Sequence, residues 1–231
     1  MMSRTRVRPT PPRPVQLPAA LDDPREHELD ELGHRSQLEH ARLHDVDLRH
    51  RDLVGSTWSG VDGRNVTLAS SDISGAFLTD LRLASSDLAN LGARGASLQR
   101  VEVVDGRSVG LGLNEGFLQD VSFHDCQLDF AAFRFARLQR VVFRNCRMHE
   151  FDLTSTQLQS VLFEDCDLTD ADLTRAEFER CEMRRCILSG VRGVQDLKGV
   201  AMSMLDVIDL APLFASACGV NILDADAAED D

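Results

Sequence analysis

The chain has 231 residues, a formal net charge of −13 and a hydrophobic content of 43%. This length is typical of one domain with enough apolar material for a core, and the acidic balance argues against general nucleic-acid binding. Tyrosine is absent and aromatic residues make up only 5% of the chain, which favours a narrow core of small aliphatic side chains.

Residues 1–20 are rich in arginine and proline. The segment holds Arg4, Arg6, Arg8 and Arg13, five prolines and no acid. This composition predicts a disordered tail, because the segment has little apolar surface to bury. A basic contact with nucleic acid or with a partner is the alternative. The segment lacks the apolar core of a secretory signal, and no apolar run in the chain is long enough for a membrane span.

Residues 21–37 are predicted to form a short capping helix. Asp23 suits the N-cap position and Pro24 the first turn, and Gly33 is expected to end the helix. We expect this helix to cover the open N-terminal end of the structure that begins at residue 38, because uncovered strand edges invite aggregation.

Residues 38–192 repeat with a period of five. The stretch 161–190 reads VLFED CDLTD ADLTR AEFER CEMRR CILSG, with small or apolar residues at the first position of each five and large apolar residues at the third. A period of five fits neither a helix, near 3.6, nor a strand, at 2. It indicates a chain that turns a corner every five residues and directs the first and third side chains inward.

The frame continues without an insertion from Leu38 to Leu188. All 31 third positions are apolar except Gly63 and Ser108. Such self-similarity predicts a solenoid, in which each unit buries its face against its neighbours. We expect distorted coils at 51–65 and 104–116, where the pattern weakens. The predicted core includes Phe123, Leu128, Phe143, Phe163, Leu168, Leu173, Phe178 and Leu188.

Several fives resemble the A-(D/N)-L-x-x pattern of the pentapeptide-repeat family. Matching examples are Ala171-Asp172-Leu173, Cys166-Asp167-Leu168 and Ser86-Asp87-Leu88. The resemblance implies an all-β fold, a right-handed quadrilateral β-helix with about twenty residues in each coil. The repeats then form about eight coils, with short α-helical caps at both ends.

Residues 195–219 leave the five-residue frame and carry a helical apolar pattern: Met204, Val207, Ile208, Ala211, Phe214 and Cys218. Ser203 suits the start, Gly219 the end, and Pro212 is expected to kink or split the helix. This helix either caps the last coil or, as in some members of the family it resembles, forms a homodimer contact. Residues 220–231 form an acidic tail.

Four cysteines, Cys126, Cys146, Cys166 and Cys186, are spaced by twenty residues. On a twenty-residue coil they form one column. The column would extend over about 14 Å, whereas the ligands of a zinc ion converge within about 2.3 Å. We therefore expect small buried apolar residues rather than a metal site. Unpaired cysteines without a secretory signal favour a reducing cytoplasm.

The sequence holds no HExxH, phosphate loop, nucleophile elbow or CxxC. A narrow packed β-helix also offers no concave pocket. We expect no cofactor and no catalysis.

Pentapeptide-repeat proteins of the quinolone-resistance type bind DNA gyrase and topoisomerase IV with a rod that imitates duplex DNA, and the resemblance implies such a protein partner. Residues 38–192 hold 24 acids and 18 bases. The side with Leu48, Leu68 and Leu168 carries 6 acids and 3 bases, which is a modest excess. The candidate partner-binding face consists of Asp47, Asp87, Asp129, Asp167 and Asp170.

The sequence leaves two points open. A structural scaffold or spacer without affinity for topoisomerase is the alternative function. Residues 134–147 contain five arginines and no acid. They either form a binding patch or balance acids on neighbouring coils.

Overall fold

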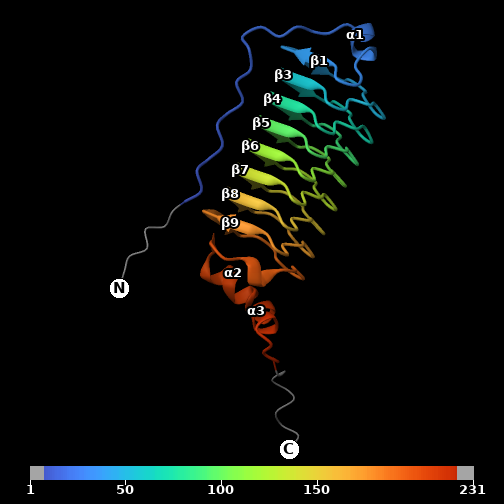
Figure 1. The fold of residues 1–231 in the computed structure, drawn as a ribbon. Helices are drawn as coiled ribbons and strands as arrows, with labels where there is room; N and C mark the ends of the chain where they lie inside the picture. The colour runs from blue at the N-terminus through green and yellow to red at the C-terminus, as the bar shows by residue number, and fades with distance from the viewer. Residues whose placement is uncertain (1–7, 223–231) are drawn as a thin grey trace, which may run out of the picture.

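The computed structural model describes residues 8–222, which form a β-solenoid of about eight coils (Figure 1). The strands pair in parallel in a single 11-stranded sheet. From β1 to β10 paired residues are twenty positions apart, as Phe123 and Phe143 are. The predicted β-helix with a twenty-residue coil is therefore confirmed.

The strands lie at equivalent places in successive coils. Their bounds are β1 Gln37–Glu39, β2 Arg42–His44, β3 Thr57–Arg64, β4 Phe77–Ala84, β5 Ser97–Val104, β6 Phe117–His124, β7 Arg137–Arg144, β8 Gln157–Glu164, β9 Glu177–Glu179, β10 Cys181–Arg184 and β11 Val200–Ala201. Each eight-residue strand bends over two sides of the coil. The other two sides are turns, which isolated bridges such as Asp87↔Arg107 join to their neighbours.

A left-handed corner explains the period of five. Every fifth residue from Arg35 to Gly190 has a positive φ, between 49° and 71°. This conformation reverses the chain direction locally and is unfavourable for most L-residues. The sequence pattern identified the inward first and third positions, but it did not identify the left-handed fifth position.

The inward side chains form one continuous core. Phenylalanine rings stack along it, with centroids 5.2 Å apart between Phe123 and Phe143 and 5.0 Å between Phe143 and Phe163. Of the predicted core residues, Leu128, Leu168, Leu173 and Leu188 are also buried. The prediction was too strong for Phe178, which is only partly buried, because its short strand β9 pairs only with β8 among the described strands.

The predicted distortions at 51–65 and 104–116 are wrong. Strand β3 pairs with β4 in unbroken register, although it contains Trp58 and Gly63. The space that Gly63 leaves is filled by Leu83, whose Cδ2 lies 2.6 Å from where a β-carbon on Gly63 would be. Ser108 is buried in a coil that keeps its regular bridges.

The N-terminal cap differs from the prediction of a helix over 21–37. Helix α1 covers only Glu26–Asp30. It begins after Arg25, whose N–H donates to Glu28 Oε2 at 2.7 Å, rather than at Asp23. Asp22 instead forms a parallel bridge with Ala41 and extends the sheet over the first coil.

The C-terminal segment caps the last coil with several short elements. They are the 3-10 turn η1 Val194–Asp196, helix α2 Met204–Asp209 and helix α3 Ala211–Ala217. Pro212 lies in the first turn of α3, so it divides the expected single helix in two. Leu210 is buried and Phe214 packs against the core.

Within residues 8–222, no helix is both long enough and apolar enough to cross a membrane.

Residues 8–20 are not a disordered tail in this structure. They run beside the strands from the level of β9 and β10 to the N-terminal end of the solenoid (Figure 1). Their order has a physical cause, because the backbone N–H groups of Arg13 and Gln16 each donate to a carboxylate of the solenoid at 3.0 Å. Residues 1–7 of the predicted tail, and 223–231 of the predicted acidic tail, lie outside the described residues.

Candidate partner-binding surface

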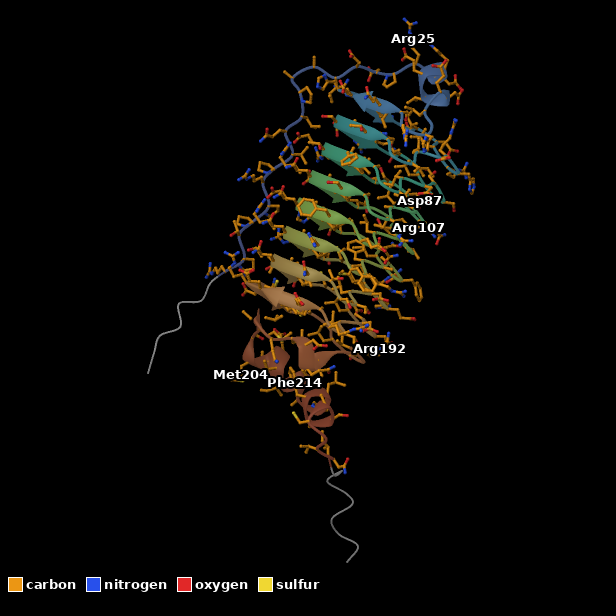
Figure 2. All side chains as sticks on the ribbon, in the orientation of Figure 1. Arg25, Asp87, Arg107, Arg192, Met204 and Phe214 are labelled. Atoms are coloured by element: carbon orange, nitrogen blue, oxygen red, sulfur yellow. The ribbon has the colours of Figure 1, made fainter. Side chains whose placement is uncertain are left out.

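The five candidate acids lie on one side of the solenoid. We call it the acidic side; it is formed by residues 46–50 and their equivalents every twenty residues. It is one of the two turn sides, as the isolated bridges show. Asp87 and Arg107 lie on the edge of the molecule away from the N-terminal segment (Figure 2). The predicted grouping therefore corresponds to one surface.

Three of these acids stabilise the turn that they occupy. Asp47, Asp87 and Asp167 each accept a hydrogen bond from the backbone N–H two residues later, at 3.0, 3.0 and 3.1 Å. An aspartate that bonds its own backbone in this way is a turn-forming residue. The repeated aspartate at the second position is thus explained by the fold, without any partner.

Arginines pair with three acids of the acidic side. Oxygen–nitrogen distances are 2.6 Å for Asp47–Arg49, 3.1 Å for Asp87–Arg107 and 2.6 Å for Asp129–Arg147. Asp167 Oδ2 lies 2.8 Å from His149 Nε2. Hydrogen bonds from Arg49 hold the pKa of Asp47 at about 2. Asp170 is exposed and has no ion-pair partner within residues 8–222. The surface is therefore not a row of free carboxylates like the phosphates of DNA.

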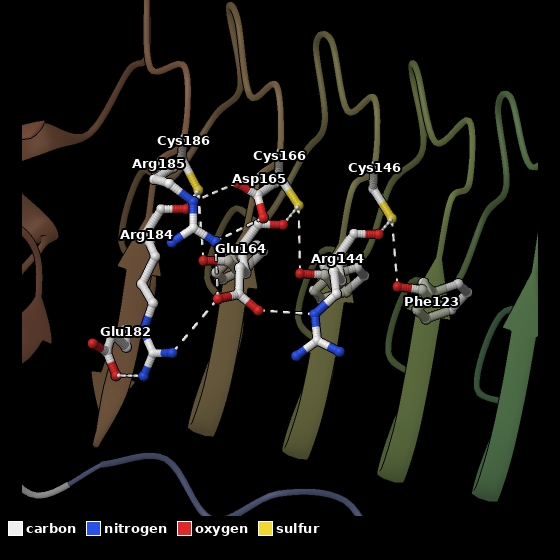
Figure 3. Close-up of polar contacts among 12 residues, drawn as sticks. Phe123, Arg144, Cys146, Glu164, Asp165, Cys166, Glu182, Arg184, Arg185 and Cys186 are labelled. Atoms are coloured by element: carbon white, nitrogen blue, oxygen red, sulfur yellow. Dashed lines mark hydrogen bonds and ion pairs between the residues drawn. The ribbon is translucent and has the colours of Figure 1, made fainter.

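Four of the five arginines between 134 and 147 balance neighbouring acids. The pairs are Arg134–Asp152, Arg140–Asp120, Arg144–Glu164 and Arg147–Asp129. Figure 3 shows Arg144 and Arg185 on either side of Glu164, which accepts a bond from each. Arg137 has no such partner in the described part of the chain. The run is thus mainly a charge-balancing feature.

The cysteine column is a set of buried free thiols. Cys126, Cys146 and Cys166 are buried and Cys186 is partly buried. Each sulfur points to a carbonyl of the preceding coil (Figure 3), as Cys166 Sγ does to Phe143 O at 3.4 Å. Burial raises the pKa of Cys186 to about 12. The described residues contain no cluster of side chains suited to hold a metal ion.

Two exposed phenylalanines were missed by the sequence analysis. Phe130 and Phe135 are 57% and 58% exposed, and both occupy left-handed corners with φ of 58°. In the equivalent places of other coils the chain has small or polar residues, among them Ser70, Asn90, Gly110, Glu115 and Arg175. Recognising the fifth position as a left-handed corner would have identified a phenylalanine there as anomalous.

A second feature was also missed, at the corner between the two strand sides. Asp80 and Asp120 bind the N-terminal segment and pair with Arg100 and Arg140, at 2.6 Å each. The available signal was the alternation of aspartate and arginine every twenty residues. Sequence reasoning did not use it, because the partner of these residues was expected to be disordered.

Two models of pentapeptide-repeat families match the chain. The model described as "Pentapeptide repeats (8 copies)" matches residues 41–80, and the model described as "Pentapeptide repeat region" matches residues 117–192. No curated protein matches the chain.

Solved structures with the same repeat are similar only at low identity. One is HetL from the cyanobacterium Nostoc sp. strain PCC 7120, a pentapeptide repeat protein involved in heterocyst differentiation regulation. Its sequence is 17% identical, the alignment covers 76% of this chain and 94% of HetL, and the TM-score is 0.37. Full-length QnrB1, a plasmid-mediated fluoroquinolone resistance protein, is 14% identical, with 77% and 98% covered and a TM-score of 0.32. The two family matches together cover half of the chain, which therefore belongs to the pentapeptide-repeat family.

Proposed function

We propose that the chain is a non-catalytic rod that binds another protein through the acidic side and the two successive corners that follow it, occupied by Phe130 and Phe135. Phe130 and Phe135 carry this proposal. A left-handed conformation costs an L-residue about 1–2 kcal/mol, and an exposed ring gains little from burial in the chain's own core. Two such residues on consecutive corners are better explained by a partner than by folding.

The surroundings of Phe130 fit a protein contact. It follows Asp129, a residue that is 5% exposed and whose carboxylate is bound to Arg147. Protein interfaces combine an aromatic anchor with a rim of polar groups that already have hydrogen bonds. The ion pairs of the acidic side provide such a rim and fix its side chains before binding.

A comparative capture experiment tests this proposal. The full-length protein, the double variant Phe130→Asn/Phe135→Asn and the control Phe77→Asn serve as baits in a lysate of the source cells. Phe77 is a matched control because it is 58% exposed on strand β4. We expect at least one protein to be captured in tenfold smaller amount by the double variant than by the unmodified bait, and in unchanged amount by the Phe77→Asn control. If no protein distinguishes the baits, the scaffold alternative replaces the proposal.

Type II topoisomerases are the first partners to test, because the resemblance to the quinolone-resistance type of pentapeptide-repeat protein implies them. Purified protein is added to gyrase or topoisomerase IV in a supercoiling or decatenation assay, with and without a fluoroquinolone. Weaker inhibition after Asp170→Asn would support DNA mimicry. Weaker inhibition after Phe130→Asn would support a contact made by the exposed aromatic residues. No effect at high excess would exclude these enzymes as partners.

A second copy of the chain is proposed as the partner of helix α2. Met204, Leu205 and Ile208 are 74%, 74% and 58% exposed, on a helix that also caps the solenoid. Light scattering of the full chain should give a dimer mass, and Ile208→Glu should give a monomer, whereas Asp209→Asn on the same helix should leave the dimer intact. A monomer at all accessible concentrations would remove this proposal.

A further inference from the structure

Residues 8–18, here called the N-terminal strap, follow one corner column of the solenoid. Three contacts fix the path. The N–H of Arg13 donates to Asp120 Oδ1 at 3.0 Å, and the N–H of Gln16 donates to Asp80 Oδ1 at 3.0 Å. Pro18 lies against Gly60, where a β-carbon would be 2.9 Å from its ring. The close approach at residue 60 therefore requires glycine.

The spacing of these contacts matches an extended proline-type chain. A polyproline II helix rises about 3.1 Å per residue, and neighbouring coils are about 4.8 Å apart. Arg13 to Gln16 is then about 9.3 Å, against about 9.6 Å for the two coils from Asp120 to Asp80. Three strap residues therefore cover the two coils between Asp120 and Asp80.

The two carboxylates are fixed acceptors. Asp80 is bound by Arg100 through two hydrogen bonds of 2.6 and 2.7 Å, and Asp120 by Arg140 through two of 2.6 and 2.8 Å. With the strap in place, their side chains are only 14% and 2% exposed. A carboxylate held in this way loses little entropy when it accepts a backbone N–H, so the site is preorganised.

The strap also covers apolar residues at positions where most coils have polar ones. Val142 faces outward from β7, yet it is only 8% exposed. It lines, with Leu162 and the strap prolines, a cleft of about 530 Å³ that remains between the strap and the strands. Charged residues, among them Glu102, Arg144 and Arg184, line the same cleft. The strap therefore lies over a channel of mixed apolar and charged lining without filling it completely.

We propose that this channel is a binding site for extended proline-rich segments of other proteins, and that the strap is its built-in competitor. A fitting segment has prolines and two free backbone N–H groups three residues apart. Recognition through backbone bonds tolerates varied side chains, and proline lowers the ordering entropy. The site is separate from the surface proposed above, because the strap follows the corner column of Asp120, whereas Phe130 lies on a corner two sides away and Phe135 on a corner one side away.

The test uses full-length protein and a fluorescein-labelled peptide with the sequence of residues 8–18. In one variant, Pro11, Pro12 and Pro14 are replaced by glycine to loosen the strap. We expect the peptide to bind this variant at least tenfold more tightly than the unmodified chain. Adding Asp80→Ala should weaken that binding at least tenfold, a typical loss for a hydrogen bond to a charged group. Adding Asp87→Ala instead should not weaken the binding of the peptide, because Asp87 has an arginine partner but lies on the acidic side, away from the strap.

A register control keeps the test valid if the Asp80 variant does not fold. A peptide with one alanine inserted between Val15 and Gln16 shifts the second N–H by about 3.1 Å and should bind the loosened protein at least tenfold more weakly. Equal binding of both peptides, equal binding to the Asp80→Ala protein, or no binding to the loosened protein would each overturn the proposal.

Discussion

The carboxylate of Asp120 accepts a hydrogen bond from the backbone N–H of Arg13, which lies 107 residues earlier in the chain. The same carboxylate binds the guanidinium of Arg140 on the next coil. A single buried side chain thus joins two neighbouring coils and the N-terminal strap. The conformation of the strap depends on the ionised state of this group.

The strap should remain bound in mild acid. Burial opposes ionisation of Asp120, but hydrogen bonds from Arg140 and from the Arg13 N–H outweigh it and hold the pKa below its ordinary value. Arg100 and the Gln16 N–H do the same for the pKa of Asp80. A carboxyl whose pKa is lowered by folding stabilises the structure at high pH, and this contribution is lost as the pH falls through the folded-state pKa.

We therefore expect the Arg13 and Gln16 N–H groups to stay protected from hydrogen exchange at pH 5 and to lose protection only below about pH 4. Exchange measured by NMR at several pH values, corrected for the intrinsic rate, checks this. Loss of protection between pH 7 and pH 5 would show that these carboxylates do not hold the strap.

Phe130→Asn should not destabilise the solenoid. Asparagine tolerates the left-handed region better than phenylalanine does, and the ring is already 57% exposed. We expect an unfolding free energy that is unchanged or higher by up to about 1 kcal/mol. Phe133→Asn is the control; Phe133 is fully buried, and its replacement should cost at least about 3 kcal/mol. If Phe130→Asn lowers stability as much as the control does, Phe130 is part of the packing.

Leu168→Arg should unfold the coils around it. Leu168 has no exposed surface in the core, and an unpaired guanidinium there cannot reach water or an acid. We expect loss of the β signal in circular dichroism, whereas Leu168→Ala should cost about 2–5 kcal/mol. Glu150→Arg, at an exposed corner, should leave the melting temperature nearly unchanged. A folded Leu168→Arg protein would mean that the inward column is assigned wrongly.

The six cysteines should differ sharply in reactivity. Cys218 is exposed, whereas burial raises the pKa of Cys181 to about 11 and that of Cys186 to about 12. A disulfide reagent at pH 8 should give one fast thiol, removed by Cys218→Ser, and the remaining thiols only on unfolding. A second fast thiol in the folded Cys218→Ser protein would contradict the burial of the column.

The same two thiols predict a decrease in stability at alkaline pH. Between about pH 9 and their folded-state pKa values, the native protein holds protons that the unfolded chain has lost. The unfolding free energy should therefore fall as the pH rises above about 9.

The architecture was predictable because the need to bury apolar side chains is enough to determine which positions face inward. Leu128, Phe143 and Leu168 repeat in a frame without gaps, and a regular coil is the arrangement that buries all of them. The acidic side was predicted as a surface for the same reason. Its ion pairs with Arg107 and Arg147 were at most an open alternative, because a spacing of about twenty places two side chains on neighbouring coils without fixing which partners they choose.

The strap and the exposed aromatic corners required the structure. The composition of residues 8–18 indicated disorder because such a segment cannot fold by itself, but the solenoid supplies acceptors at the matching spacing. The anomaly of Phe130 becomes visible only when the fifth position is known to be left-handed. Both features depend on backbone geometry, which the apolar pattern does not encode.

Photo-crosslinking tests the central claim most directly. Benzoylphenylalanine is introduced at Phe130 in the full chain within its own cells, and at Phe77 as the control. We predict a crosslink to one other protein from position 130 that is absent from position 77 and is weakened by Phe135→Asn. If position 130 yields no product beyond that of position 77, the rod does not bind a partner at this corner.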